Sequence, residues 1–107
     1  MSQVKLTDLE GAPKEGEIKV VEFDHPWTEI NYRLALFFAK GRYLALRDEC
    51  YNCGSSFETG ELKAMYVFCA REQHAWNIKT GLYKFDRRLS IPTYRVAIQD
   101  DGLYIEI

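Results

Sequence analysis

All three cysteines of the chain and one of its two histidines fall within residues 50–81. Two residues separate Cys50 from Cys53, and four residues separate Cys69 from His74. Two short loops that each carry a pair of thiolate or imidazole donors are a common way to gather four ligands around a metal. The spacing therefore predicts a metal site formed by Cys50, Cys53, Cys69 and His74.

Several kinds of chemistry suit these four side chains. Three thiolates and one imidazole can complete a tetrahedral zinc site, and thiolates with or without imidazole hold iron–sulfur clusters. A thiolate beside an imidazole can also act as a nucleophile, but no acidic residue at a recognisable spacing would orient the imidazole. Cysteines are also often buried as small apolar side chains. Because all four residues cluster at loop ends, we favour a bound metal.

The bulk composition indicates an ordinary soluble globular protein. A chain of 107 residues is expected to form one domain, and 47% apolar with 28% charged residues is typical of that class. The net charge of −2 argues against nucleic acid as a partner. The one basic group apparent along the chain, Lys84 with Arg87 and Arg88, is typical of a solvated turn.

A cytoplasmic setting without membrane attachment is expected. The first residues do not resemble a signal peptide, and the longest apolar run, residues 34–39, is too short to cross a bilayer. In a reducing compartment, clustered cysteines more often bind metals or carry redox chemistry than form disulfides.

The elements that must position the four donors are predicted to be strands. The clearest hairpin has the connection Ala39-Lys40-Gly41, and a second is expected across Gln99-Asp100-Asp101-Gly102, where Asp-Gly is a strong hairpin signal. No segment shows convincing helical periodicity. Residues 60–62 are expected to turn. The pattern predicts an all-β antiparallel sandwich or small barrel. The expected strands are residues 4–9, 17–23, 32–38, 42–46, 65–68, 75–78, 82–85, 94–98 and 103–107.

The stretch 50–81 resembles the Rieske domain, whose two loops carry Cys-x-His and Cys-x-x-His around a 2Fe–2S cluster. Cys50 and Cys69 match the two cysteines of that family. Residues 74–78, His-Ala-Trp-Asn-Ile, with the following Thr-Gly, resemble its His-Gly-Trp-x-Phe and Thr-Gly turn. Small and apolar positions after the first cysteine also match the family, namely Gly54, Phe57, Gly60 and Leu62. The hairpin before this cysteine and residues 92–107 resemble the family as well.

The resemblance implies a single Rieske-like domain over residues 1–107. Its scaffold strands would lie in residues 3–47 and 82–107. Its cluster-binding subdomain would consist of the loops 50–60 and 69–81.

The chain departs from the Rieske pattern at the ligands. Asn52 stands where the first histidine is expected, and Ala70 replaces the proline after the second cysteine. The gap between Cys69 and His74 is also two residues longer than in the family. Cys53 could supply the missing ligand. Alternatively, the cluster is lost or replaced by zinc, as the small subunit of some assimilatory nitrite reductases is Rieske-like without the ligands.

The resemblance implies a small ferredoxin that carries electrons for an oxidoreductase and is not itself catalytic. Its protein partner would be a reductase or an oxygenase. The alternative is a cluster-free or zinc-holding subunit that serves protein interaction. In the carrier, His74 would face the partner, with Phe57, Ala75 and Asn52 forming the contact surface around it.

Overall fold

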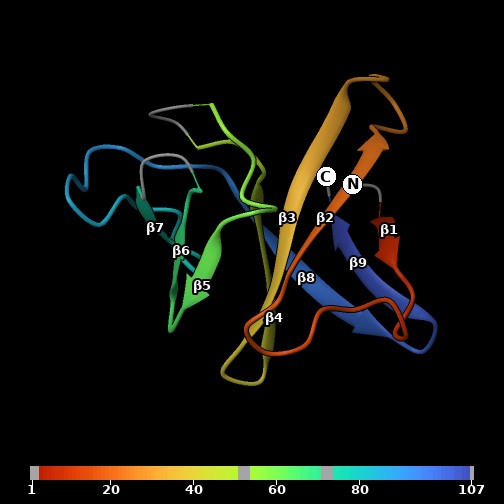
Figure 1. The fold of residues 1–107 in the computed structure, drawn as a ribbon. Helices are drawn as coiled ribbons and strands as arrows, with labels where there is room; N and C mark the ends of the chain where they lie inside the picture. Colours follow the sequence, from red (N-terminus) through yellow and green to blue (C-terminus); the bar gives the residue numbers. More distant parts are fainter. Residues whose placement is uncertain (1–2, 51–53, 71–73, 107) are drawn as a thin grey trace.

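A computed structural model describes residues 3–50, 54–70 and 74–106 of the chain. In these residues the chain forms nine β-strands, arranged in one six-stranded and one three-stranded antiparallel sheet (Figure 1). The described residues contain no α-helix, and so no helix able to cross a membrane. The all-β prediction is confirmed.

The larger sheet curls into a nearly closed barrel. Its strand order is β1-β9-β8-β4-β3-β2, so β1 and β2 are the two edges. The side chain of Lys19 on β2 joins these edges by donating to the carbonyl oxygen of Gly11, at 2.6 Å, and to Thr7 Oγ1, at 3.4 Å. The strands are β1 (Gln3–Thr7), β2 (Ile18–Asp24), β3 (Asn31–Ala39), β4 (Arg42–Arg47), β8 (Thr93–Gln99) and β9 (Gly102–Glu106).

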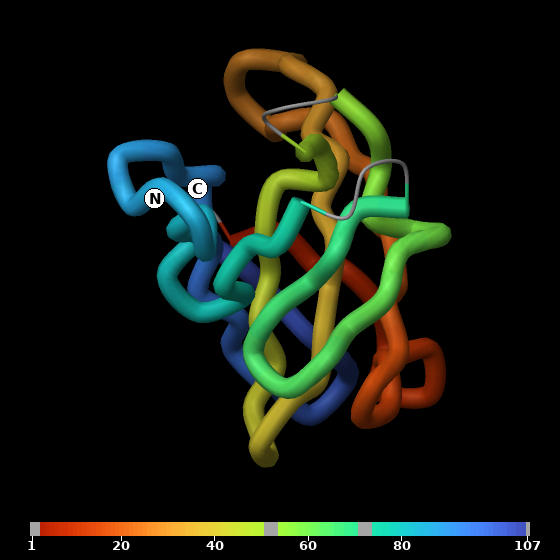
Figure 2. The backbone as a smooth tube through the Cα atoms, turned by 60° about the vertical axis from the view of Figure 1, so that its left-hand side comes forward, coloured from red at the N-terminus to blue at the C-terminus, as the bar shows by residue number. Residues whose placement is uncertain are grey.

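The smaller sheet contains β5 (Glu61–Lys63), β6 (Tyr66–Phe68) and β7 (Ala75–Asn77), and it lies beside the β3–β4 hairpin (Figure 2). The main core fills the space between the two sheets, where Phe37 and Leu46 of the barrel pack in one cluster with Val67 and Trp76 of the smaller sheet. A second cluster, around Leu36, Ala45 and Leu103, fills the barrel.

Strand β3 separates these two cores. Residues 34–37 are consecutive and all fully buried, because side chains alternate between the faces of a strand and both faces of β3 are covered.

The predicted hairpin after β3 is confirmed. Ala39 pairs with Arg42, and Lys40 and Gly41 both have positive φ, 53° and 75°, as a type I′ turn requires.

Two sequence-based assignments next to the donor loops are wrong. Residues 61–63 form β5, where a turn was expected, because Glu61 pairs with Phe68 and positive φ at Ala64 (53°) closes a tight connection to β6. Residues 82–85 are not a strand. This segment makes isolated bridges only, since the amide of Tyr83 donates to the carbonyl oxygen of Leu89 and the chain then turns away.

Candidate metal centre

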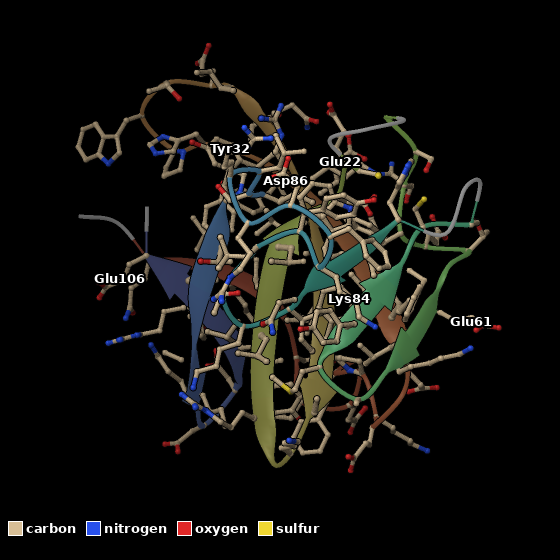
Figure 3. All side chains as sticks on the ribbon, turned by 90° about the vertical axis from the view of Figure 1, so that its left-hand side faces the viewer. Glu22, Tyr32, Glu61, Lys84, Asp86 and Glu106 are labelled. Atoms are coloured by element: carbon tan, nitrogen blue, oxygen red, sulfur yellow. The ribbon has the colours of Figure 1, made fainter. Side chains whose placement is uncertain are left out.

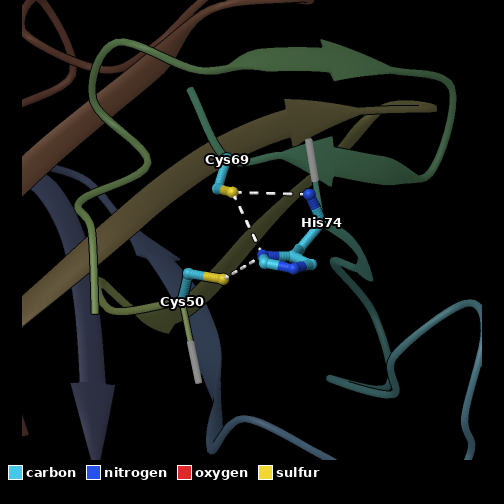
Figure 4. A group of neighbouring side chains, drawn as sticks. All are labelled: Cys50, Cys69 and His74. Atoms are coloured by element: carbon cyan, nitrogen blue, oxygen red, sulfur yellow. Dashed lines mark hydrogen bonds between the residues drawn. The ribbon is translucent and has the colours of Figure 1, made fainter. Parts of the chain in front are cut away.

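The structure brings three of the four predicted donors together: Cys50, Cys69 and His74 (Figure 4). Nδ1 of His74 lies 3.4 Å from Sγ of Cys50 and 3.6 Å from Sγ of Cys69. The three donor atoms are all within 4.8 Å of one another. The fourth predicted donor, Cys53, lies outside the described residues, as does Asn52.

Strand pairing explains why Cys69 and His74 meet. Cys69 directly follows β6 and His74 directly precedes β7, and these two strands are antiparallel neighbours in which Phe68 pairs with Ala75. The next residues outward therefore face each other, and the amide of Cys69 donates to the carbonyl oxygen of His74 at 3.0 Å. The four-residue gap, which departs from the Rieske pattern, is compatible with this pairing.

Cys50 comes from the other sheet, shortly after β4 ends. Its amide donates to the carbonyl oxygen of Ser55, at 2.9 Å, and its own carbonyl oxygen accepts from the amide of Gly54, at 2.7 Å. Gly54 has a φ of 72°, a left-handed conformation that glycine adopts without strain. These bonds fold the chain back on both sides of the first donor loop.

Asp48 anchors the same loop, and the sequence reasoning missed it. Its carboxylate is buried and accepts from Ser56 Oγ (2.6 Å), the amide of Phe57 (2.7 Å) and Nε of Arg33 (2.7 Å). The hydrogen bond from Arg33 to this carboxylate raises the pKa of the guanidinium. The signal in the sequence is weak, because the three partners lie 8, 9 and 15 residues away.

Both sulfur atoms are buried and accept hydrogen bonds from N–H groups. Nε1 of Trp76 donates to Sγ of Cys50 at 3.4 Å, and the amide of His74 donates to Sγ of Cys69 at 3.3 Å. Cys50 is 0% and Cys69 1% exposed. Such donors stabilise the negatively charged thiolate, which is the form of cysteine that binds metals.

The surface around His74 differs from the prediction. Phe57 and Ala75 are fully buried in the core and cannot form a contact surface. Instead, the ring of Tyr83 packs edge-on against His74, with centroids 5.9 Å apart, and Phe85 packs against Tyr83 at 5.6 Å. Phe85 is 69% exposed, so this chain of rings leads from His74 to the solvent.

The donor set fits a metal by its chemistry. Zinc–sulfur and zinc–nitrogen bonds of tetrahedral sites imply a sulfur-to-nitrogen separation of about 3.6 Å. The two separations of 3.4 and 3.6 Å agree with donors on one tetrahedral ion. Thiolates and imidazole are also iron–sulfur ligands. The assignment of these atoms as ligands is a proposal.

Neither a protein-family model nor a curated protein matches this chain. Solved structures do match. The ferredoxin of Sphingomonas yanoikuyae B1 aligns over 99% of both chains, with a TM-score of 0.82 and 21% identity. A chain from the complex of oxygenase and ferredoxin in carbazole 1,9a-dioxygenase aligns over 96% of this chain and 91% of its own length, with a TM-score of 0.77 and 17% identity. A protein assigned as a nitrite reductase NADPH small subunit aligns over 100% of both chains, with a TM-score of 0.81 and 18% identity.

These similarities concern the fold. The chain has the all-β fold of Rieske-type ferredoxins over nearly its whole length, as the resemblance implied. The similar proteins include both ferredoxins and a nitrite reductase subunit.

Proposed function

We propose that this chain is an electron-transfer protein, the ferredoxin component of an oxidoreductase system, and that residues 1–107 work as one unit. The loops 50–60 and 69–81 would hold a 2Fe–2S cluster through Cys50, Cys69 and His74. One observation carries the proposal: three soft or borderline donors converge, with N–H donors on both sulfurs, within the fold of ferredoxins.

A bound cluster would supply a site that takes up and releases one electron. The residues of this chain provide its surroundings. Trp76 and the amide of His74 stabilise charge on the two sulfurs, and the core around Cys50 and Cys69 excludes water from them. Hydrogen bonds to sulfur and burial are among the factors that set the potential of such centres.

Cys53 is proposed as the fourth ligand, because Asn52 offers only an amide, a poor ligand for iron. A thiolate in place of an imidazole adds negative charge. We therefore expect a reduction potential below that of centres with two histidines. A redox titration with a midpoint as high as theirs would contradict this ligand set.

The partner is proposed to be a reductase or oxygenase, and the catalytic step would belong to it. One similar structure is a complex of oxygenase and ferredoxin. The partner would dock over Phe85, which connects through Tyr83 to His74. Lys84 lies over the smaller sheet, with its Nζ 5.7 Å from the ring centroid of Phe85 (Figure 3). A reducing, cytoplasmic setting is part of this proposal, since it preserves the thiolates.

A second candidate function is a zinc-holding or metal-free interaction subunit. The two sulfur-to-nitrogen separations suit three donors on one tetrahedral ion, which favours this candidate, and zinc accepts such a donor set. The likeness to a nitrite reductase small subunit is consistent with a subunit role. In this case Cys50, Cys69 and His74 would have a structural role only.

Metal analysis of protein purified anaerobically tests both candidates. Equal iron and acid-labile sulfide with visible absorption supports the carrier, whereas one zinc, or no metal, supports the subunit. Cys53→Ser should lose or destabilise the metal if Cys53 is a ligand and should retain it otherwise. His74→Ala should lose the metal, and the matched control His25→Ala, which changes the other histidine of the chain, should keep it.

A further inference from the structure

A basic groove lies at the end of β4 remote from the donor residues. Arg42 begins β4, near the β3–β4 turn at the bottom of Figure 1, whereas Cys50 follows the other end of the strand. A cavity of about 390 Å³ here is lined by β4, β8 and the turn after β7, and it includes Arg42, Lys79 and Arg95. An adjoining cavity of about 340 Å³ shares Arg42 and Lys79 and adds Lys40. The two cavities together are called the basic groove.

The strand register places two of these cations on one face. Leu44 on β4 pairs with Arg95 on β8, so their side chains point to the same side of the sheet. Arg42 lies two residues before Leu44 and therefore points to that side as well. The pairing of β4 with β8 ends at Leu44, although β4 itself begins at Arg42. The groove lies where these two strands part.

A fixed turn brings in the third cation. Oδ1 of Asn77 accepts from the amides of Lys79, at 2.9 Å, and Thr80, at 3.0 Å. The amide of Gly81 donates to the carbonyl oxygen of Asn77 at 2.8 Å. These three bonds fix the turn that carries Lys79, and this residue lines the same cavity as Arg42 of β4 and Arg95 of β8. A residue from the end of the smaller sheet thus completes a site on the larger one.

The positive charges of the groove are not neutralised within the described part of the chain. None of its ion pairs includes Lys40, Arg42, Lys79 or Arg95. Among the described residues that line the two cavities, none is acidic. Four basic side chains thus surround one concave surface of a protein whose net charge is −2. This arrangement attracts an anion.

We propose that the basic groove binds a small anion that carries at least two phosphate or carboxylate groups. Two adjoining cavities with shared cations suit two charged groups on one molecule. The cavity volumes fall at the lower end of the range, about 300 to 1,000 Å³, of small-molecule sites. Leu44 and Ile78 add an apolar wall that suits an organic ligand. This proposal does not depend on whether the chain binds a metal.

Titration of the whole protein with pyrophosphate and, separately, with citrate tests the proposal. The readout is the amide shifts in two-dimensional NMR at low ionic strength. We expect saturable shifts confined to residues 39–45, 65, 77–80 and 93–98, which include the lining of both cavities. The tighter of the two anions identifies phosphate or carboxylate as the preferred group. The double variant R42Q/R95Q should bind at least tenfold more weakly. The matched control Lys63→Gln, a cation outside both cavities, should bind like the parent.

The result can also overturn the proposal. No saturable shift up to 10 mM of either anion, or equal affinity in R42Q/R95Q, would show that no small-anion site exists. Tighter binding of a polyglutamate peptide than of both small anions would assign the groove to an acidic macromolecule instead. Because Arg42 and Arg95 are exposed, the double variant should fold, and its unfolding curve checks this.

Discussion

Asp48→Ala is expected to destabilise the loop that carries Cys50. The substitution removes a buried carboxylate that accepts three hydrogen bonds, from Arg33, Ser56 and Phe57. The fully buried Phe57 then has an amide whose acceptor is lost, while the hydroxyl of Ser56 and the guanidinium of Arg33 can turn towards water. The three bonds therefore differ in what their loss costs.

The largest part of the cost comes from Phe57. A buried amide left without an acceptor costs about 1–3 kcal/mol. Arg33 is 43% exposed, so its pair with Asp48 is screened and adds about 1 kcal/mol or less. The lost hydrogen bond from Ser56 adds to these two terms, so we expect the free energy of unfolding to fall by about 3–4 kcal/mol in total. That is a large share of the about 5–15 kcal/mol that stabilises a typical domain.

Urea denaturation followed by circular dichroism, with reductant and chelator present, measures this change without a contribution from metal. Asp101→Asn is the matched control. Its carboxylate also accepts hydrogen bonds, from Tyr104 Oη at 2.9 Å and Lys5 Nζ at 3.5 Å, but its side chain is 62% exposed. We expect a much smaller loss there, because solvent screens the interactions of an exposed carboxylate. The reasoning is refuted if Asp48→Ala costs no more than Asp101→Asn.

Three further outcomes are expected. Burial raises the pKa of Tyr94 above its ordinary value, so stability that is fully present below about pH 10 is lost as the pH rises through the pKa of the folded state. Tyr94→Phe should reduce this loss of stability at alkaline pH in denaturation curves. An unchanged dependence of stability on pH would exclude Tyr94 as its source. Gly60→Ala should destabilise the protein by about 2–3 kcal/mol, because a Cβ there would clash with the carbonyl oxygen of Phe68. Gly16→Ala, with open space around it and φ of 87°, should cost about 1–2 kcal/mol in the same assay. If the chain is an electron carrier, Phe85→Ala should slow electron transfer to its partner in stopped-flow experiments at an unchanged potential, and an unchanged rate would place the docking surface elsewhere.

Local sequence signals were sufficient for much of the fold. Gly41 marked the β3–β4 hairpin because glycine readily adopts the positive φ that the turn requires there. The grouping of Cys69 with His74 was also predictable, since both residues flank one antiparallel strand pair. In each case the determining contacts lie within a few residues along the chain.

Features that depend on distant partners could not be predicted. Asp48 is identified by its burial and by partners on two separate segments, Arg33 on β3 and Ser56 with Phe57 after the first donor loop. Arg42 and Arg95 come together only through the register of β4 and β8, so no local pattern in the sequence indicates the groove. The only basic group apparent along the chain was Lys84 with Arg87 and Arg88. Residues 82–85 have the apolar and aromatic composition of a strand, but the amide of Tyr83 donates to the carbonyl oxygen of Leu89 and the chain turns away, a loop closure that composition does not indicate.

The origin of the three donors in two different sheets has a mechanical consequence. Cys50 is attached to the barrel, whereas Cys69 and His74 belong to the three-stranded sheet. An ion coordinated by all three would act as a crosslink that closes a loop of the chain and restrains the unfolded ensemble much as a disulfide does. Removal of the ion would then destabilise the smaller sheet, β5–β7, more than the barrel. The amides of that sheet would be the first to lose protection from hydrogen exchange.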